Sequence, residues 1–379
     1  MNYSTDGQFV PPEQNGVDGQ NRNFGPAVPH FVSYEFWNSQ KKCIKKLSTF
    51  AAVAILLFMF LSSVYSGIAQ AVLKIASVSL TYFEYQQFAE KWNSSEFQAV
   101  FEIMYSVLIV GGPFFLVGRR AKKRGYLESI PMDKPLNTKF LPLIIVGAFG
   151  ICLFGNVITS YFLAAIEIFF GIKLQTPAMP AVSPTFLGIL MCYVSRAVVP
   201  ALIEEMALRG IIMQPLRRYG DKFAIVCSSL IFGLMHCNLI QSPFAILAGF
   251  AIGYAVIVTE SLWTGIIIHF LNNAFSVTVT IVTDLYGLDS KEYLFCNTFF
   301  ISAMVIGGMC TFVYLKKFSK PLKKTSLVNQ GKNFYALPHP YSARVSDKML
   351  YKTFLLNAPM LIAFIAVIYE TIVLTAALT

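Results

Sequence analysis

Six polar side chains suited to acid–base chemistry lie within long apolar stretches of the sequence. They are Glu204, Glu205, Arg209, His236, His269 and Asn273, and they include two of the four histidines in the protein. An ionisable side chain at membrane depth is energetically costly, so each one is a candidate for a functional site. The chemistry that these residue types favour is the activation of water and the stabilisation of negative charge.

The spacing of these residues predicts that they meet at one depth. Glu204 lies about 15 residues before a turn at 219–220 and His236 about 16 residues after it, so each is roughly 23 Å from that turn along a helix. His269 and Asn273 are spaced i, i+4 and share one helix face. Asn273 is roughly 18 Å into its own apolar stretch. We therefore expect these four side chains to face a common pocket.

Glu205 and Arg209 have the i, i+4 spacing of an ion pair within one helix. Such a pair neutralises one carboxylate and leaves Glu204 free. A buried pair of this kind can also serve only to fix helix packing, and that role is compatible with catalysis nearby. Pro200 precedes Glu204 by four residues and should kink or loosen the helix, which opens room for water.

The elements that carry these residues are membrane helices. Of 379 residues, 55% are hydrophobic and 13% are charged, which is too apolar for an ordinary soluble domain. Only helices and closed barrels satisfy their backbone inside hydrocarbon, and apolar runs such as 51–61 and 361–367 do not alternate as barrel strands do. The sequence predicts an all-α, polytopic transmembrane helical bundle.

About nine spans are expected from apolar runs of roughly 20 residues. A cytoplasmic N-terminus places the basic clusters that flank the spans on the inner side, as the positive-inside rule requires. The pattern at 41–68 also resembles a signal peptide, but its apolar run is too long, and we expect an uncleaved first span. The expected spans are 47–68, 97–117, 140–170, 185–214, 223–240, 243–259, 263–283, 297–315 and 354–378.

The chain divides into four expected regions. A tail at 1–40 is rich in Asn, Gln, Gly and Pro and is predicted to be disordered. N-terminal transmembrane helices at 41–184 precede a core at 185–283 that carries the six polar residues. C-terminal transmembrane helices at 284–379 include a basic cytoplasmic loop at 316–352. No internal repeat is apparent, which disfavours an inverted-repeat transporter.

The net charge of +10 raises the question of a nucleic-acid partner. The basic residues cluster beside the spans, so we expect anionic membrane lipid as the partner and no nucleic acid. Seven cysteines without a CxxC motif indicate neither a disulfide framework nor a thiolate zinc site. The oligomeric state is not indicated by the sequence.

Three motifs in order, EExxxR, FxxxH and HxxxN, resemble the CPBP family of intramembrane proteases. That family includes the CAAX prenyl endopeptidases (CAAX prenyl protease 2) and proteins of the abortive-infection or bacteriocin-immunity type. The resemblance covers about 185–283, and Leu208 departs from it because members often carry an aromatic residue there, which bears on packing. The motif residues are Glu204, Glu205 and Arg209; Phe232 and His236; His269 and Asn273.

The resemblance implies an endopeptidase in the membrane of the cell, expected to be the plasma membrane. Its substrate would be a membrane-associated or lipid-modified protein or peptide at the inner leaflet. Prenylated CAAX proteins are the substrate class of the eukaryotic branch of the family, whereas bacterial members process a peptide precursor or a bacteriocin.

The same chemistry follows from the residues. Glu204 is suited to be the general base because desolvation raises the pKa of a buried carboxyl group. His236 would hold and polarise the water, and His269 and Asn273 would donate to the oxyanion, each donor contributing about 3 kcal/mol. Arg209 would hold Glu205 and tune the field on Glu204.

A zinc site is the alternative chemistry for two histidines and a glutamate. Metalloproteases usually present these ligands in an HExxH motif on one helix, and that motif is absent from the sequence. A metal-free mechanism with no cofactor is favoured, and zinc remains possible.

Two other functions are compatible with the same residues. A non-catalytic immunity or scaffold protein would bind a peptide in the cavity, and a proton-coupled transporter would use the carboxylates and histidines as a relay. Simple hydrogen bonding between helices is the alternative role for the histidines, Asn272 and Asn273. Arg196 and Glu370 are further charges within spans, to which we assign no role.

Overall fold

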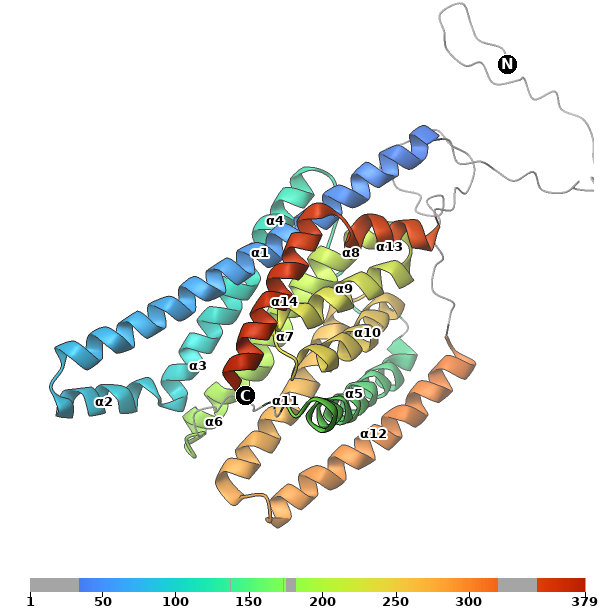
Figure 1. The fold of residues 1–379 in the computed structure, drawn as a ribbon. Helices are drawn as coiled ribbons and strands as arrows, with labels where there is room; N and C mark the ends of the chain where they lie inside the picture. Colours follow the sequence, from blue (N-terminus) through green and yellow to red (C-terminus); the bar gives the residue numbers. More distant parts are fainter. Residues whose placement is uncertain (1–33, 137, 173, 175–181, 320–345, 379) are drawn as a thin grey trace, which may run out of the picture. The chain divides into compact units, whose positions relative to one another are not determined.

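The computed structural model is a bundle of α-helices (Figure 1). It describes residues 34–136, 138–172, 174, 182–319 and 346–378, and this part of the chain contains no strand. The predicted all-α, polytopic class is therefore confirmed. The helices are α1 (Tyr34–Ser79), α2 (Tyr82–Trp92), α3 (Ser95–Met104), α4 (Gly112–Lys123), α5 (Leu141–Phe170), α6 (Phe186–Tyr193), α7 (Val199–Glu205), α8 (Met213–Leu216), α9 (Asp221–Met235), α10 (Ser242–Thr259), α11 (Leu262–Tyr286), α12 (Lys291–Lys317), α13 (Asp347–Leu355) and α14 (Ala358–Leu378).

One of the nine expected spans corresponds to a helix that is too short to cross a membrane. Among the described residues, seven helical stretches are long and apolar enough to cross a membrane, and α13 with α14, bent by 65°, could form an eighth. The expected span at 223–240 corresponds to α9, which has 15 residues and is therefore roughly 22 Å long. Helix α9 ends because Cys237 adopts a positive φ of 50°, which the α-helix cannot accommodate.

Two predicted regions fall largely outside the described residues, namely most of the tail at 1–40 and of the loop at 316–352. The described end of the tail is helical, because α1 begins at Tyr34. Helix α1 also continues to Ser79, well beyond the expected end of the first span at 68. Helix α2 was not expected, and it begins with a capping box in which Thr81 and Glu84 exchange hydrogen bonds.

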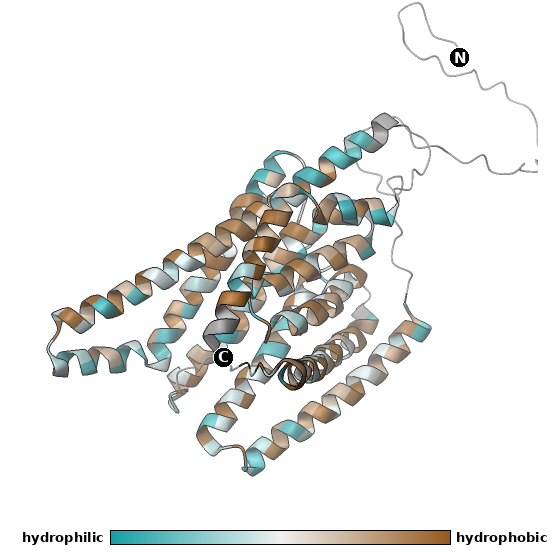
Figure 2. Cartoon of the chain, viewed as in Figure 1, coloured by the Kyte–Doolittle hydropathy of each residue, from teal (hydrophilic) through white to brown (hydrophobic). Residues whose placement is uncertain are grey.

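The outward surface of the bundle is apolar. Figure 2 shows hydrophobic residues along the outward faces of the long helices, in contrast to a soluble protein. Large side chains that are more than half exposed occur on α1, α5, α12 and α14. Examples are Phe60, Phe169, Phe312 and Ile365. These faces fit a hydrocarbon solvent, so the chain is an integral membrane protein.

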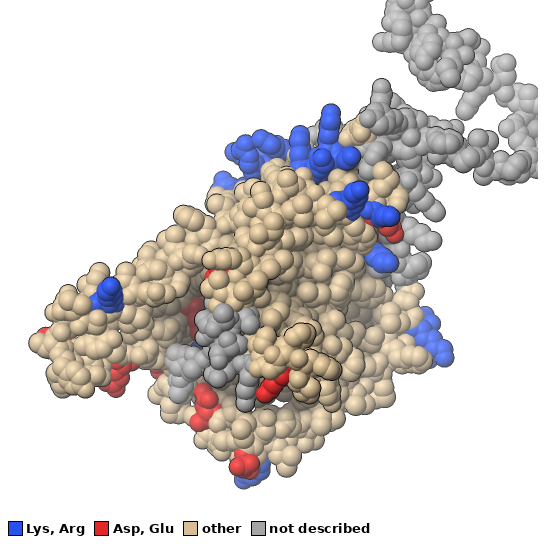
Figure 3. All heavy atoms as spheres, viewed as in Figure 1, with Lys and Arg blue, Asp and Glu red and all other residues tan. Residues whose placement is uncertain are grey.

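Lys and Arg side chains gather at one end of the bundle, which we call the basic end (Figure 3). Asp and Glu side chains are seen mainly towards the opposite end. This separation is the pattern that the positive-inside rule predicts for a membrane protein. The basic end includes Lys41, Lys42, Arg119, Arg120, Lys122 and Lys123.

Helices α5 and α12 pack closely because glycines face each other. A Cβ atom added at Gly150 would lie 2.6 Å from the Cα atom of Gly307. Small residues allow this approach between membrane helices, where dispersion contacts and not the hydrophobic effect hold helices together.

We predict that Gly150→Val forces α5 and α12 apart and destabilises the protein by about 1–3 kcal/mol, as overpacking does. Thermal unfolding of the purified protein in detergent measures the effect as a lower Tm. Gly308→Val is the matched control, because a Cβ atom at Gly308 meets nothing within 4 Å. Equal Tm values for the two variants would contradict the close glycine contact.

Candidate active site

The two adjacent glutamates lie where the regular α-helix of the fourth span is interrupted. Helix α7 carries them at its end, between π-helical segments at Val194–Val198 and Met206–Ile212. Such π-helical turns widen a helix locally and frequently occur at functional sites. The expectation that Pro200 loosens this helix agrees with the π-helical segment directly before α7, since proline lacks the N–H that a regular helix would use.

The predicted ion pair between Glu205 and Arg209 is present. Nη1 of Arg209 lies 2.7 Å from Oε1 of Glu205, and both side chains are fully buried. The guanidinium also lies over the ring of Phe232, 4.6 Å from its centroid, and Nη2 donates to the carbonyl of Gly249 at 3.4 Å. The pair is thus held from α9 and α10 as well as from its own span.

His269 on α11 contacts both glutamates. Its Nδ1 is 2.9 Å from Oε1 of Glu205, and its Nε2 is 3.8 Å from Oε2 of Glu204. The first distance is a hydrogen bond, whereas the second is too long for one. A gap of this size between polar atoms is one that a water molecule can bridge.

Glu204 is the more accessible of the two carboxylates. Its side chain is 17% exposed, whereas that of Glu205 is 0% exposed. The two neighbours therefore differ in environment: Glu205 is enclosed and ion-paired, and Glu204 is partly exposed.

His236 lies just beyond α9, at the turn that ends this helix. The Phe232 ring packs between the two histidines, with centroid distances of 5.4 Å to His236 and 5.7 Å to His269. His236 is within electrostatic range of Glu204 and His269. The structure therefore brings the two histidines and the two glutamates together, as the sequence predicts.

Asn273 makes no hydrogen bond to either carboxylate in the described part of the chain. In the described part of the chain, its side chain makes one hydrogen bond, accepted by its Oδ1 from Asn272 at 3.3 Å. The Oδ1 atom of Asn272 is buried and has no hydrogen-bond partner. Asn273 shares the helix face of His269 but lies one turn further along α11.

A glycine that the sequence analysis did not single out permits the approach of α11. A Cβ atom at Gly265 would lie 2.9 Å from Oε2 of Glu205 and 2.6 Å from a methyl group of Val256. Gly265 precedes His269 by one helical turn. The sequence could have indicated Gly265, because a small residue one helical turn from a candidate histidine is typical of close helix packing.

Two other polar interactions were not predicted from the sequence. Tyr105, the first residue of a π-helical segment at Tyr105–Gly111, shares a hydrogen bond of 3.0 Å with Ser62 and is within electrostatic range of Glu204. Arg196, to which no partner was assigned, binds both oxygens of Glu102 through Nε at 3.0 Å. The sequence did not predict these pairs because residue spacing within one span does not identify a partner on another span.

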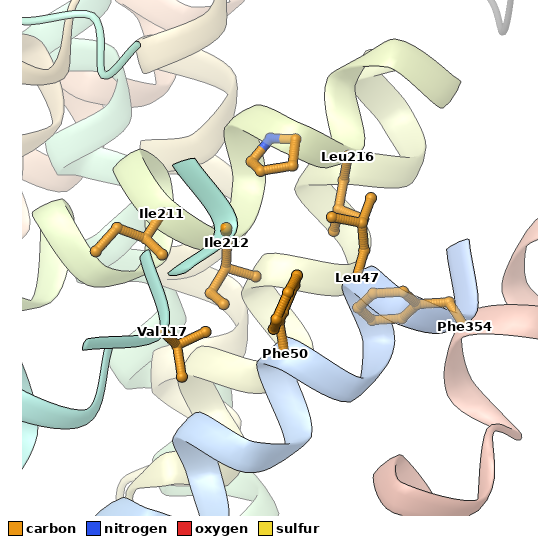
Figure 4. A pocket seen from close by; sticks show the side chains of 9 residues that line it. Leu47, Phe50, Val117, Ile211, Ile212, Leu216 and Phe354 are labelled. Atoms are coloured by element: carbon orange, nitrogen blue, oxygen red, sulfur yellow. The ribbon is translucent and has the colours of Figure 1, made fainter. Parts of the chain in front are cut away.

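An apolar pocket is present apart from the two glutamates, and Figure 4 shows the side chains that line it. It forms where α1, α4, the end of the fourth span and α13 meet, and it contains none of the six candidate residues. Its lining is Leu47, Phe50, Val117, Ala121, Ile211, Ile212, Pro215, Leu216 and Phe354.

Comparison with protein families identifies the part of the chain that holds this geometry. Residues 185–275 match the family model described as type II CAAX prenyl endopeptidase Rce1-like. The family resemblance is confirmed for this segment. Comparisons with curated proteins and with solved structures gave no match.

The Rce1-like segment contains all six candidate residues. It spans α6 to the first half of α11, so the fourth span, α9, α10 and the helix that carries His269 all belong to it. The family is one of intramembrane proteases, and the chain is a membrane protein that carries a segment of this type.

We predict that Arg209→Ala strongly destabilises the protein, because it leaves the Glu205 carboxylate buried without its cation. The expected loss is about 3–5 kcal/mol, measured by thermal or denaturant unfolding in detergent. Replacing both residues by Met should recover much of that loss. Arg124→Ala, an exposed site at the basic end, is the control and should change stability by less than about 0.5 kcal/mol. An unchanged free energy of unfolding in Arg209→Ala would contradict a charged pair between Arg209 and Glu205.

We predict that Gly265→Ala displaces α11 from Glu205 and reduces stability by about 1–3 kcal/mol. Unfolding measurements test this directly. Gly253→Ala on α10 is the matched control, because a Cβ atom there would meet its nearest neighbour at 3.5 Å, an ordinary contact. Similar behaviour of the two alanine variants would be inconsistent with the close approach of α11 to Glu205.

Proposed function

We propose that this protein is an intramembrane endopeptidase that hydrolyses a peptide bond in a membrane-associated or lipid-modified protein or peptide. The observation that supports this most is the position of His269 between the two glutamates, with Nδ1 on Glu205 and Nε2 facing Glu204. The arrangement separates an orienting carboxylate from a free one. General acid–base catalysis requires that division of roles.

Glu204 is the general base in this proposal. A water molecule near Glu204 and His236 gives one proton to the Glu204 carboxylate while its oxygen forms a bond to the scissile carbonyl carbon. The carbonyl oxygen then carries the negative charge of a tetrahedral intermediate. When this intermediate collapses, the C–N bond breaks and the proton on Glu204 passes to the leaving amine.

His269 stabilises the oxyanion in the proposed reaction. When Nδ1–H donates to Glu205, the ring atom that faces the reaction space is Nε2, and a proton on Nε2 makes it a donor. Glu205, fixed by Arg209, holds the ring in this orientation. Asn273 serves as a second donor once its side chain turns from Asn272 towards the substrate.

Zinc is the alternative for this set of residues. Among the described residues, no group of three or more His, Cys, Asp and Glu side chains has an arrangement that could hold a metal ion. The residues as placed do not fit a zinc site, so we derive no step through a metal and favour the glutamate-dependent mechanism.

The proposed substrate reaches the site from the basic end. We take this end to be cytoplasmic by the positive-inside rule, with the plasma membrane as the location and a cytoplasmic N-terminus. The family description names CAAX prenyl endopeptidases, so a prenylated peptide is the first substrate to test. Anionic lipid at the inner leaflet is the proposed lipid partner of the basic end.

We predict that Glu204→Gln lowers cleavage of a lipid-modified reporter peptide by about 10²–10⁴-fold, as loss of a general base does. The assay uses purified protein in liposomes, with and without a zinc chelator, and activity should persist with the chelator. Glu167→Gln is the control because Glu167 is an exposed carboxylate on α5. Inhibition by the chelator would replace the glutamate mechanism with a metal-dependent one, and an active Glu204→Gln enzyme would refute the role of Glu204.

A further inference from the structure

A second charged network lies at the basic end, away from the two glutamates. Arg217, in the short 3₁₀-helical turn Arg217–Tyr219 that ends the fourth span, binds Glu260 with both terminal nitrogens. Nη1 lies 2.8 Å from Oε2 and Nη2 lies 2.8 Å from Oε1. This is the paired geometry in which arginine binds a carboxylate with the greatest directional constraint.

The same guanidinium also contacts the start of α9 and its own span. Its Nε donates to Oδ1 of Asp221 at 3.0 Å, and its Nη1 donates to Oε1 of Gln214 at 3.2 Å. Gln214 in turn donates from Nε2 to the backbone carbonyl of Arg209 at 2.9 Å. Arg217 therefore links the fourth span, the start of α9 and the turn that precedes α11, and one branch ends on the backbone of Arg209.

Glu260 occupies the turn between α10 and α11. Its φ of 49° reverses the chain there, and α11 begins two residues later at Leu262. His269 follows Leu262 by seven residues in sequence, so it lies roughly 10 Å deeper along the helix. Because a helix is stiff over this length, the position of Glu260 constrains the depth of His269, together with the hydrogen bonds that hold Ser261 and Leu262 to residues 131–133.

The Arg217–Glu260 pair acts on geometry more than on stability. The Arg217 side chain is 12% exposed and that of Glu260 is 37% exposed, and an ion pair so close to solvent contributes little to folding. The Arg217–Asp221 pair is more buried, because the Asp221 side chain is 4% exposed, and it also stabilises the fold. The fourth span and α11 must nevertheless keep His269 within 2.9 Å of Glu205. The Arg217 network is a direct tie between these two helices at their basic ends.

We propose that Arg217 is a positioning residue of the active site, which sets the depth of α11 and His269 relative to Glu205 through Glu260 and Gln214. The inference rests on the proposed protease function for its effect on catalysis. Its effect on the position of α11 does not depend on that function.

Kinetics of purified variants test the catalytic part. Arg217→Ala should lower kcat by about tenfold to a hundredfold, as small displacements of catalytic groups do, with KM changed by less than about twofold. Arg217→Lys keeps the charge but not the paired geometry. Its kcat should lie between those of the wild-type protein and Arg217→Ala. Lys222→Ala is the matched control, because Lys222 is an exposed cation at the same end, and it should retain wild-type kcat. Wild-type kcat in folded Arg217→Ala, or an equal loss in Lys222→Ala, would overturn the proposal.

A double-mutant cycle distinguishes positioning through Glu260 from a separate effect of each residue. Arg217→Ala combined with Glu260→Gln should be no worse than the stronger single variant, because both remove one interaction. Multiplicative losses in kcat would overturn the coupling.

Hydrogen–deuterium exchange measures the position of α11 without any substrate. In Arg217→Ala, peptides that cover 260–272 should take up deuterium at least about tenfold faster, while α12 peptides stay unchanged. Faster exchange in a protein without protease activity would support the positioning role and refute only the proposed function. Unchanged exchange at 260–272 would overturn the positioning role.

Discussion

The site depends on one carboxylate oxygen. Oε1 of Glu205 accepts from Arg209 at 2.7 Å and lies 2.9 Å from Nδ1 of His269. A buried carboxylate is stable as an anion only where such partners surround it. Arg209 belongs to the fourth span, whereas His269 belongs to α11. The Glu205 anion therefore has both of its partners only when α7 and α11 are packed together.

This constraint explains features that are otherwise unrelated. Gly265 removes the side chain that would collide with Glu205, and the carbonyl of Gly249 accepts from Arg209. The π-helical segments on either side of α7 alter the register of the fourth span around Glu204. These glycines and π-helical segments reduce side-chain packing or helix regularity. They also allow polar groups inside the bundle to come into close contact.

The sequence predicted what depends on local spacing. The apolar runs gave the helical class, the i, i+4 spacing predicted the Glu205–Arg209 pair, and distances from the turn at 219–220 predicted that His236 and Glu204 are near each other. The expected span at 223–240 was longer than α9, because the apolar run continues past Cys237, where the positive φ ends the helix. Spacing shows which face a residue occupies but not its partner on another helix. The bond from His269 to Glu205 and the one from Arg196 to Glu102 were therefore not foreseen.

The early end of α9 has a consequence for the supply of the reactant. The last carbonyls of any helix lack partners within that helix, and hydrocarbon provides none. At the end of α9 the carbonyls of Gly233 and Leu234 accept from the backbone N–H groups of His236 and Cys237, and the carbonyl of His236 accepts from the side-chain amide of Asn238. A helix end of this kind favours polar surroundings, so the turn that places His236 also supplies polar groups that would hold the hydrolytic water of the proposed reaction.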